Sequence, residues 1–353
     1  MKVAEIGVNE LEGFLKELLA KNVVDCLMLP FRVGKTVTYM LIRDPEKMGS
    51  PVLFVPVFGI SAANIAKGWT IEQKMGIVAK PCEIRAAIEL IKLEQIAPES
   101  VLLISVDCAG AYNLKDYAEH TDEIGDVLDA SKVDSLRKKG VELRTACQIC
   151  DKRLAEYGDI GIARVGSDKV QIVALSQKGE DAISAIELAV EDKDVSREGE
   201  RAKIAEEAKK RESEIARISS VEELDDVLAS CILCKNCRDM CPVCYCKVCF
   251  FEQPLGDVKG GDLLNLAELR GVLRVPSPVQ MFYHLTRLYH VCTTCVGCGA
   301  CEDACPSEIP LTKIYPMVAA KVQEMFDYEP GKSVEEPLPL TTYKEEEYEE
   351  YLR

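Results

Sequence analysis

The feature that most constrains this chain is a cysteine spacing that occurs twice in its C-terminal third. The cysteines of the two runs are Cys231, Cys234, Cys237 and Cys241, then Cys295, Cys298, Cys301 and Cys305. Each run is followed by proline and fits C-x2-C-x2-C-x3-C-P, a pattern with which proteins bind 4Fe–4S clusters. A lone C-x-x-C would be weak evidence, but two complete runs predict two clusters.

The spacing also predicts which cysteines share a cluster. Three thiolates two residues apart wrap one corner of a cube, whereas the fourth, past a short turn, is aimed at the neighbouring cube. One cluster is therefore expected on Cys231, Cys234, Cys237 and Cys305, and the other on Cys241, Cys295, Cys298 and Cys301. Gly297 and Gly299 permit a tight loop close to the sulfurs. Zinc is the alternative metal, although structural zinc sites usually pair two separated C-x-x-C knuckles.

Other cysteines and two histidines lie near these runs. The additional cysteines are Cys244, Cys246, Cys249 and Cys292. They could form a four-thiolate set of their own or supply alternative ligands, while the simpler interpretation is that they pack beside the clusters. His284 and His290 flank Arg287 and could tune a cluster by hydrogen bonding. Packing at the surface of the module is the simpler role for both histidines.

Charge and cysteine distribution limit the class of protein. The formal net charge of −16 argues against nucleic acid and anionic membranes as partners. The seventeen cysteines divide into five over 1–150, none over 151–230 and twelve over 231–305. In a reducing compartment such clustering indicates metal ligands rather than disulfides. Since no signal-peptide pattern opens the chain and no apolar run could span a bilayer, we expect a cytoplasmic protein that docks to another protein.

Periodicity predicts an α/β fold for the first half of the chain. Strands are expected at 23–30, 36–42, 51–58, 76–79 and 101–106. Asn9 and Glu12 resemble a capping box for a helix that ends near Asn22, and Pro81 begins a helix that extends to about Gln95. Strands that alternate with helices indicate a sheet covered by helices, mixed rather than purely parallel.

The whole chain is expected to contain four units. They are an α/β domain at 1–178, a charged helical linker at 179–228, a helical two-cluster module of the bacterial ferredoxin type at 229–330 and an acidic tail at 331–353. Within the linker, the charged segment 196–218 has the composition of an exposed helix with many ion pairs. Between the two cysteine runs, two helices are expected with a break near Pro276 and Pro278.

The N-terminal half contains a further set of cysteines at the ends of expected elements. These are Cys82, Cys108, Cys147 and Cys150. Cys82 follows Pro81 at a helix N-terminus, where the helix dipole favours a thiolate. From spacing alone, one shared cluster and four buried structural cysteines are equally reasonable. Cys26 lies in an apolar run and is expected in the core.

Three N-terminal segments, GIVAKPCEIRAAIEL, LLISVDCAG and ACQICDKRLAEYGDIGIARVG, carry a family resemblance. They are similar to the beta subunits of deazaflavin-coenzyme-reducing hydrogenases and formate dehydrogenases. In that family the corresponding cysteines belong to a site for a 4Fe–4S cluster beside an FAD. The resemblance therefore implies a third cluster on Cys82, Cys108, Cys147 and Cys150.

The C-terminal half resembles the extended formate dehydrogenase beta subunits through CPVCYCKVC, HLTRLYHVCTTCVGCGACEDACP and FDYEPGKSVEEPLPL. Some of those subunits work with heterodisulfide-reductase-type complexes, so the resemblance implies such subunits and a molybdenum or tungsten catalytic subunit as partners. The family's glycine-rich loop, which is associated with flavin, is not visible around residues 5–20. This departure leaves open whether the chain binds FAD, and it favours a subunit that only relays electrons.

Three functions are therefore considered, in order of preference. The first is an iron–sulfur electron-transfer subunit of a cytoplasmic, formate dehydrogenase-type complex, in which a partner converts the substrate. The second is a flavin-containing subunit that itself exchanges hydride with a deazaflavin or NAD. The third is a non-redox scaffold in which the cysteines bind zinc. Bound flavin would separate the first two functions, and metal analysis would decide the third.

Overall fold

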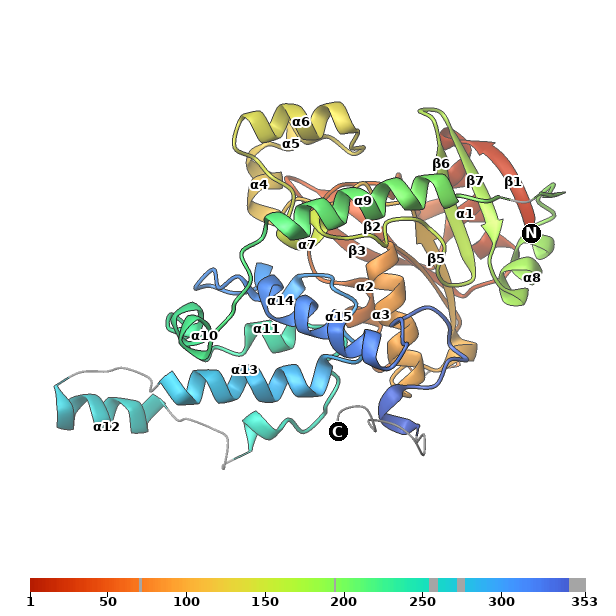
Figure 1. The fold of residues 1–353 in the computed structure, drawn as a ribbon. Helices are drawn as coiled ribbons and strands as arrows, with labels where there is room; N and C mark the ends of the chain where they lie inside the picture. Colours follow the sequence, from red (N-terminus) through yellow and green to blue (C-terminus); the bar gives the residue numbers. More distant parts are fainter. Residues whose placement is uncertain (70–71, 194, 254–259, 272–276, 343–353) are drawn as a thin grey trace.

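The computed structural model describes residues 1–69, 72–193, 195–253, 260–271 and 277–342. Its N-terminal half is built on an eight-stranded sheet with the strand order β3-β2-β4-β5-β6-β7-β1-β8 (Figure 1). The strands are β1 Lys2–Gly7, β2 Cys26–Val33, β3 Thr36–Ile42, β4 Met75–Ala79, β5 Val101–Val106, β6 Ile160–Val165, β7 Lys169–Ala174 and β8 Glu191–Asp192. The central strands β2, β4, β5 and β6 are parallel and the outer pairs are antiparallel. The expected mixed α/β sheet is therefore present.

Helices occur in the N-terminal half, in the expected linker and in the cysteine-rich half. They are α1 Leu11–Ala20, α2 Ala62–Ala66, α3 Pro81–Lys92, α4 Leu114–Glu119, α5 Thr121–Ile124, α6 Ala130–Lys138, α7 Thr145–Gln148, α8 Gln177–Ala185, α9 Glu198–Glu214, α10 Val221–Leu228, α11 Asn236–Asp239, α12 Gly260–Arg270, α13 Ser277–Val291, α14 Ala300–Asp303 and α15 Tyr315–Met325. In the cysteine-rich half, helices and loops replace strands in the described residues. A metal-bound module is expected to look like this, since ligation rather than a sheet would hold its loops.

Two predictions about local structure were wrong. The apolar segment at 51–58 is a buried loop rather than a strand, because Pro51 and Pro56 lack the amide hydrogens that a sheet strand needs. It contributes one isolated bridge, between Val57 and Tyr112. The first helix is also not capped by the expected Asn9 and Glu12 pair. A 3-10 turn at Val8–Glu10 precedes α1, and the Gly7 amide donates to the Glu10 carboxylate at 2.6 Å.

One apolar core joins the sheet to the cysteine-rich half. It contains Ile77 of β4 and Ile84 of α3 together with Leu228, Tyr283 and Tyr315 of the C-terminal helices. Burying these side chains against each other removes apolar surface of both halves from water. The expected boundaries at 178, 228 and 330 stay predictions, but the two halves are packed as one body.

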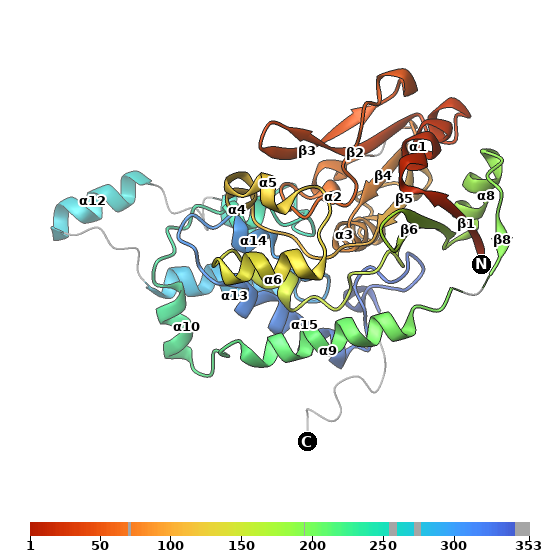
Figure 2. The same ribbon diagram turned by 90° about the horizontal axis from the view of Figure 1, so that it is seen from above.

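Helix α9 occupies most of the charged segment and lies along the outside of the molecule in both views (Figures 1 and 2). Its start is fixed by Arg197, whose guanidinium donates to both Asp107 carboxylate oxygens, at 2.7 and 2.8 Å. Asp107 directly precedes Cys108, so the linker helix is attached beside one of the candidate ligands.

Part of the expected acidic tail packs against the sheet domain. The Gly331 amide donates to the buried Glu89 carboxylate of α3 at 2.8 Å. The remaining residues, 343–353, and the expected helix break at Pro276 lie outside the described residues. Among the helices that the structure describes, none has both the length and the apolar character required to cross a membrane.

Candidate metal centres

Site 1 gathers the four cysteines predicted to share the first cluster. One cavity is lined by Cys231, Cys234, Cys237 and Cys305. Cys231 and Cys234 lie in the loop that leads into α11, Cys237 lies in α11, and Cys305 comes from the loop after α14 of the second run. The fold thus brings the last cysteine of one run to the first three of the other.

The walls of site 1 supply donors to the sulfurs. The Leu233 amide donates to the Cys231 sulfur at 3.4 Å, and the Tyr283 hydroxyl lies 3.4 Å from the Cys237 sulfur. Burial raises the pKa of both thiols. Hydrogen bonds of this kind stabilise negative charge on cluster sulfur and so adjust its potential.

His284 also belongs to site 1, and its expected place at the surface was wrong. The ring is buried, with Nε2 3.4 Å from the Cys231 sulfur and Nδ1 3.0 Å from the Tyr315 hydroxyl. Burial, and then the nearby charge of Arg287, lower the pKa of His284 to about 4, so the imidazole is neutral at pH 7. His290 is exposed, as expected.

Site 2 consists of Cys241, Cys295, Cys298 and Cys301. Burial raises the pKa of the last three thiols to about 12, and Cys241 acts on each of them as a neighbouring like charge. The Cys244 thiol lies beside Cys241, and a hydrogen bond between them lowers the pKa of Cys241. Thiols buried in this way become thiolates readily only when a metal ion supplies the compensating charge.

The two cysteine loops share one backbone conformation. Leu233 and Lys235 in the first run have φ of 55° and 64°, and Gly297 and Gly299 at the matching places in the second run have 69° and 71°. Left-handed residues turn the loop tightly so that backbone amides face the sulfurs. The first loop therefore adopts with Leu233 and Lys235 the left-handed conformation that the second loop adopts with two glycines.

Site 3 gathers the four N-terminal cysteines. Cys82, Cys108, Cys147 and Cys150 line one cavity together with Cys298 of site 2. Cys82 lies in the first turn of α3, Cys108 follows β5, and Cys147 and Cys150 lie in and just after α7. Burial raises the pKa of Cys108 to about 12 and raises the pKa of Cys150 above its ordinary value. Burial, and then the neighbouring Glu83, raise the pKa of Cys82 well above its usual value.

Arg144, which sequence reasoning missed, lies between sites 3 and 2. Its Nη1 donates to the Cys147 sulfur at 3.6 Å and its Nη2 donates to the Cys298 carbonyl at 2.8 Å. Its Nε forms an ion pair with Asp303 at 2.6 Å. The only sequence signal was its place three residues before Cys147, which does not reveal a contact with the distant second run.

The extra cysteines are divided between two places. Cys244, Cys246 and Cys249 line a separate cavity whose described lining does not include Cys292. The Cys292 thiol instead donates to the Tyr289 carbonyl at 3.6 Å. Cys244 approaches site 2 through its hydrogen bond with Cys241.

The donors of the three sites fit iron–sulfur clusters. All seventeen cysteines carry free thiols. Among the described residues, no three His, Cys, Asp or Glu side chains converge closely enough to hold a single metal ion. The four thiolates of a cube bind four different irons, so they surround a cavity instead of meeting at a point. Sites 1 and 3 have this arrangement of soft sulfur donors around a cavity.

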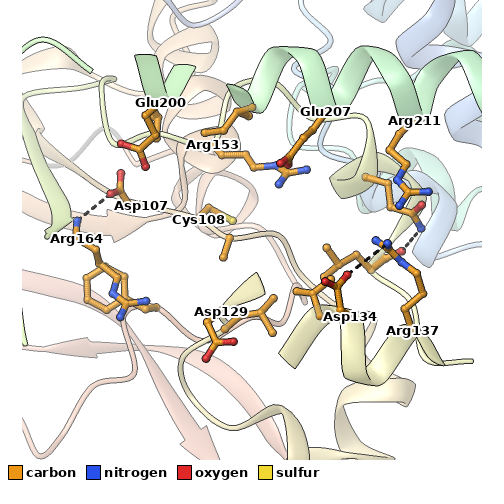
Figure 3. Close-up of a pocket in the computed structure, with 18 of the residues that line it drawn as sticks. Asp107, Cys108, Asp129, Asp134, Arg137, Arg153, Arg164, Glu200, Glu207 and Arg211 are labelled. Atoms are coloured by element: carbon orange, nitrogen blue, oxygen red, sulfur yellow. Dashed lines mark hydrogen bonds and ion pairs between the residues drawn. The ribbon is translucent and has the colours of Figure 1, made fainter. Parts of the chain in front are cut away.

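A larger charged cavity adjoins site 3 at Cys108 (Figure 3). Glu200, Glu207 and Arg211 of α9 face it from one side, and Asp134 and Arg137 of α6 face it from the other. Asp107 and Arg153 flank Cys108 at its base. This cavity gives a ligand of small-molecule size access to the edge of site 3.

Two family models match the chain. Residues 72–198 match the C terminus of the coenzyme F420 hydrogenase/dehydrogenase beta subunit, and residues 227–309 match the 4Fe-4S dicluster domain. The first match contains all four cysteines of site 3, and the second contains all eight of sites 1 and 2.

Curated relatives match over most of their length. The chain is 27% identical over 305 residues to the F420-dependent formate dehydrogenase subunit beta of Methanocaldococcus jannaschii, which covers 76% of each chain. It is 26% identical over 316 residues to the F420-dependent formate dehydrogenase 1 subunit beta of Methanococcus maripaludis, which covers 78% of each. A chain of the F420-reducing NiFe hydrogenase complex from Methanosarcina barkeri aligns with a TM-score of 0.46 at 13% identity, over 61% of this chain and 90% of that one.

These matches agree with the cysteine patterns in both halves. The chain is thus similar to the iron–sulfur beta subunits of coenzyme F420 hydrogenases and dehydrogenases, and its match to the 4Fe-4S dicluster domain follows its match to the C terminus of that beta subunit.

Proposed function

We propose that this subunit relays electrons through three 4Fe–4S clusters, in the order site 3, site 2, site 1 or the reverse. The observation that carries the proposal is the position of Cys298, which belongs to site 2 and also lines the cavity of site 3. At the other side of site 2, Cys301 has Cys237 of site 1 among the like charges that act on it. Site 2 is therefore the middle of the relay.

Both ends of this relay are accessible. Cys108 of site 3 lies in the wall of the charged cavity, and Cys234 of site 1 is exposed. Cluster ligation by thiolates, burial and hydrogen bonds to sulfur set each potential. The chain's residues thus hold and insulate the clusters, while electrons enter and leave at opposite ends.

The relatives' names support the choice of complex. We propose that the subunit works in the cytoplasm with a formate dehydrogenase-type catalytic partner that carries molybdenum or tungsten. Heterodisulfide-reductase-like subunits are the proposed acceptor partners. Free, clustered thiols suit such a reducing compartment.

A flavin-bearing function is the second candidate, and the cavity beside Cys108 favours it. Arg137, Arg153, Arg164 and Arg211 line this cavity and could pair with the phosphates of a bound FAD or deazaflavin. A flavin there would convert hydride transfer into single electrons for site 3. Release of FAD from denatured native protein, measured by absorbance and fluorescence, would establish this function in place of a pure relay.

Cys244 is the proposed alternative ligand of site 2, because its thiol lies beside Cys241. Cys246, Cys249 and Cys292 stay predictions as extra ligands. A Cys241→Ala variant that retains a complete site 2 cluster would indicate that Cys244 replaces the missing ligand.

Electron paramagnetic resonance during stepwise anaerobic reduction tests the relay. Full reduction is expected to give about three spins per chain, one for each 4Fe–4S cluster, with lines broadened by neighbouring spins. Cys82→Ala should remove one spin and narrow the signal of site 2, whereas Cys26→Ala, in the buried strand β2, should remove none. Three spins in the Cys82→Ala variant would contradict the assignment of site 3.

A further inference from the structure

Arg287 is a buried cation between the two sites of the dicluster domain. It lies in α13, and only 2% of its surface is exposed. Its guanidinium lies over the Tyr315 ring, 4.4 Å from the ring centroid. The groups that act on its charge are the Tyr315 hydroxyl and then three thiols, those of Cys241 and Cys301 in site 2 and that of Cys237 in site 1.

The protein satisfies this guanidinium only in part, because it is a hydrogen-bond donor toward the side chains of Cys241, Cys244 and Tyr315. Its Nε and Nη1 atoms are buried and have no hydrogen-bond partner. Within the described part of the chain, no carboxylate forms an ion pair with Arg287, although such pairs are made by Arg144 with Asp303 and by Arg238 with Asp239 and Glu252. An arginine stays charged at all ordinary pH values, so a buried and unpaired one is costly unless an anion lies beside it.

The missing anion has one chemical source at this position. A 4Fe–4S core bound by four thiolates is negatively charged, and it gains one more negative charge on reduction. Sulfur atoms of two such clusters, at sites 1 and 2, would accept hydrogen bonds from the free guanidinium nitrogens. Arg144 and Arg238 differ from Arg287 in that each forms an ion pair with at least one carboxylate.

We propose that Arg287 is the electrostatic partner of both dicluster clusters, and that its charge raises the reduction potential of each. This inference rests on the proposed function, since it requires clusters at sites 1 and 2. A fixed positive charge stabilises the reduced cluster more than the oxidised one, and the apolar surroundings keep the effect large. The same residue thereby keeps the middle and the terminal cluster within one range of potentials.

Redox titration of three variants of the full chain, followed by electron paramagnetic resonance, tests the proposal. Arg287→Met removes the charge, Arg287→Lys retains it, and Arg238→Met is the matched control, because Arg238 directly follows Cys237 but pairs with two carboxylates. In Arg287→Met we expect both clusters to bind the added electron at least tenfold more weakly. Their midpoint potentials should therefore fall by at least about 59 mV, the value of a tenfold change for a one-electron couple. Arg287→Lys should shift both midpoint potentials less, and Arg238→Met should shift neither of them.

Iron and sulfide content distinguishes failure of the proposed function from failure of the proposed role of Arg287. Wild-type protein without clusters at sites 1 and 2 would overturn the proposed function itself. Arg287→Met with full iron content and unchanged midpoints would overturn only the role of Arg287. If Arg287→Met fails to retain iron, the titration is made on Arg287→Lys. Arg287→Lys supports the role of the charge if it retains both clusters and their midpoint potentials lie within about 59 mV of the wild-type values. Loss of iron in that variant would overturn it.

Discussion

Two glycines in the second cysteine loop have the same conformation but different surroundings. An ideal Cβ on Gly299 would lie 2.4 Å from the Ala146 Cβ of α7, whereas nothing lies within 4 Å of one on Gly297. Both have φ near +70°. Gly299 is therefore the point at which the loop of site 2 contacts the segment that carries Cys147.

Gly299→Ala should destabilise the protein more than Gly297→Ala. Each substitution costs about 1–2 kcal/mol for a left-handed alanine, and overlap with Ala146 adds about 1–3 kcal/mol only at position 299. Thermal unfolding of the two variants at one scan rate measures the difference. Equal midpoints would mean that sites 2 and 3 are not held together at this contact.

Cys298→Ala should damage folding as well as the redox signal, because Cys298 lines both sites 2 and 3 and ligation holds these short loops together. We expect loss of at least one cluster's iron, about four atoms, and a lower unfolding midpoint. Cys26→Ala is the control, since Cys26 is buried in strand β2 and is not one of the cysteines assigned to the three sites. A normal cluster spectrum in Cys298→Ala would count against the assignment.

The cysteines could be predicted from the sequence, and their electrostatic partners could not. Local spacing fixes how Cys231, Cys234 and Cys237 face one cluster, so the pattern alone named them. Arg144 and His284 contact sulfur sites through tertiary packing, and an arginine or histidine near a cysteine in the sequence has many ordinary roles. Their function follows only from burial and distance.

At the scale of elements, α3 connects the two halves of the chain. It begins with Cys82 of site 3, and further along its Arg85 donates to the Pro330 carbonyl at 2.9 Å. Glu89, fully buried, accepts from the Tyr328 hydroxyl and the Gly331 amide and pairs with Lys92 at 3.1 Å. One helix thus fixes both a cluster ligand and the segment after α15.

Glu89→Gln should loosen this connection. Among the described residues, the change leaves the more distant Glu336, at 3.8 Å, as the carboxylate that pairs with Lys92, which also donates to the Tyr328 hydroxyl at 2.6 Å. Breaking a buried ion pair costs about 3 kcal/mol. We expect a lower unfolding midpoint and faster proteolysis within the 328–342 segment. Glu94→Gln, an exposed change just after α3, should leave both unchanged. Equal behaviour of the two variants would show that the segment is held elsewhere.

The elements themselves were predicted unevenly. Val101–Val106 and Thr36–Ile42 form strands at the expected residues, because their apolar or alternating patterns agree with the sheet environment. Residues 51–58 are equally apolar, but their prolines prevent strand pairing. The apolar pattern therefore predicted a strand where the structure has a buried loop. The outer strand β1 gave no distinct signal, since its pairing with β7 and β8 comes from distant parts of the chain.

At the scale of the whole molecule, the proposed relay places its three cysteine sites within one packed body. The shared core means that the sheet domain and the dicluster domain hold a fixed relation, which an electron relay needs because transfer depends on constant distances between clusters. The charged cavity at Cys108 and the exposed Cys234 then define its two ends.

The content of iron and acid-labile sulfide per chain, measured on anaerobically purified native protein, tests this account most directly. Three four-thiolate sites predict about twelve irons and about twelve sulfides. A value near eight would remove site 3 from the relay, and zinc without sulfide would contradict the account altogether.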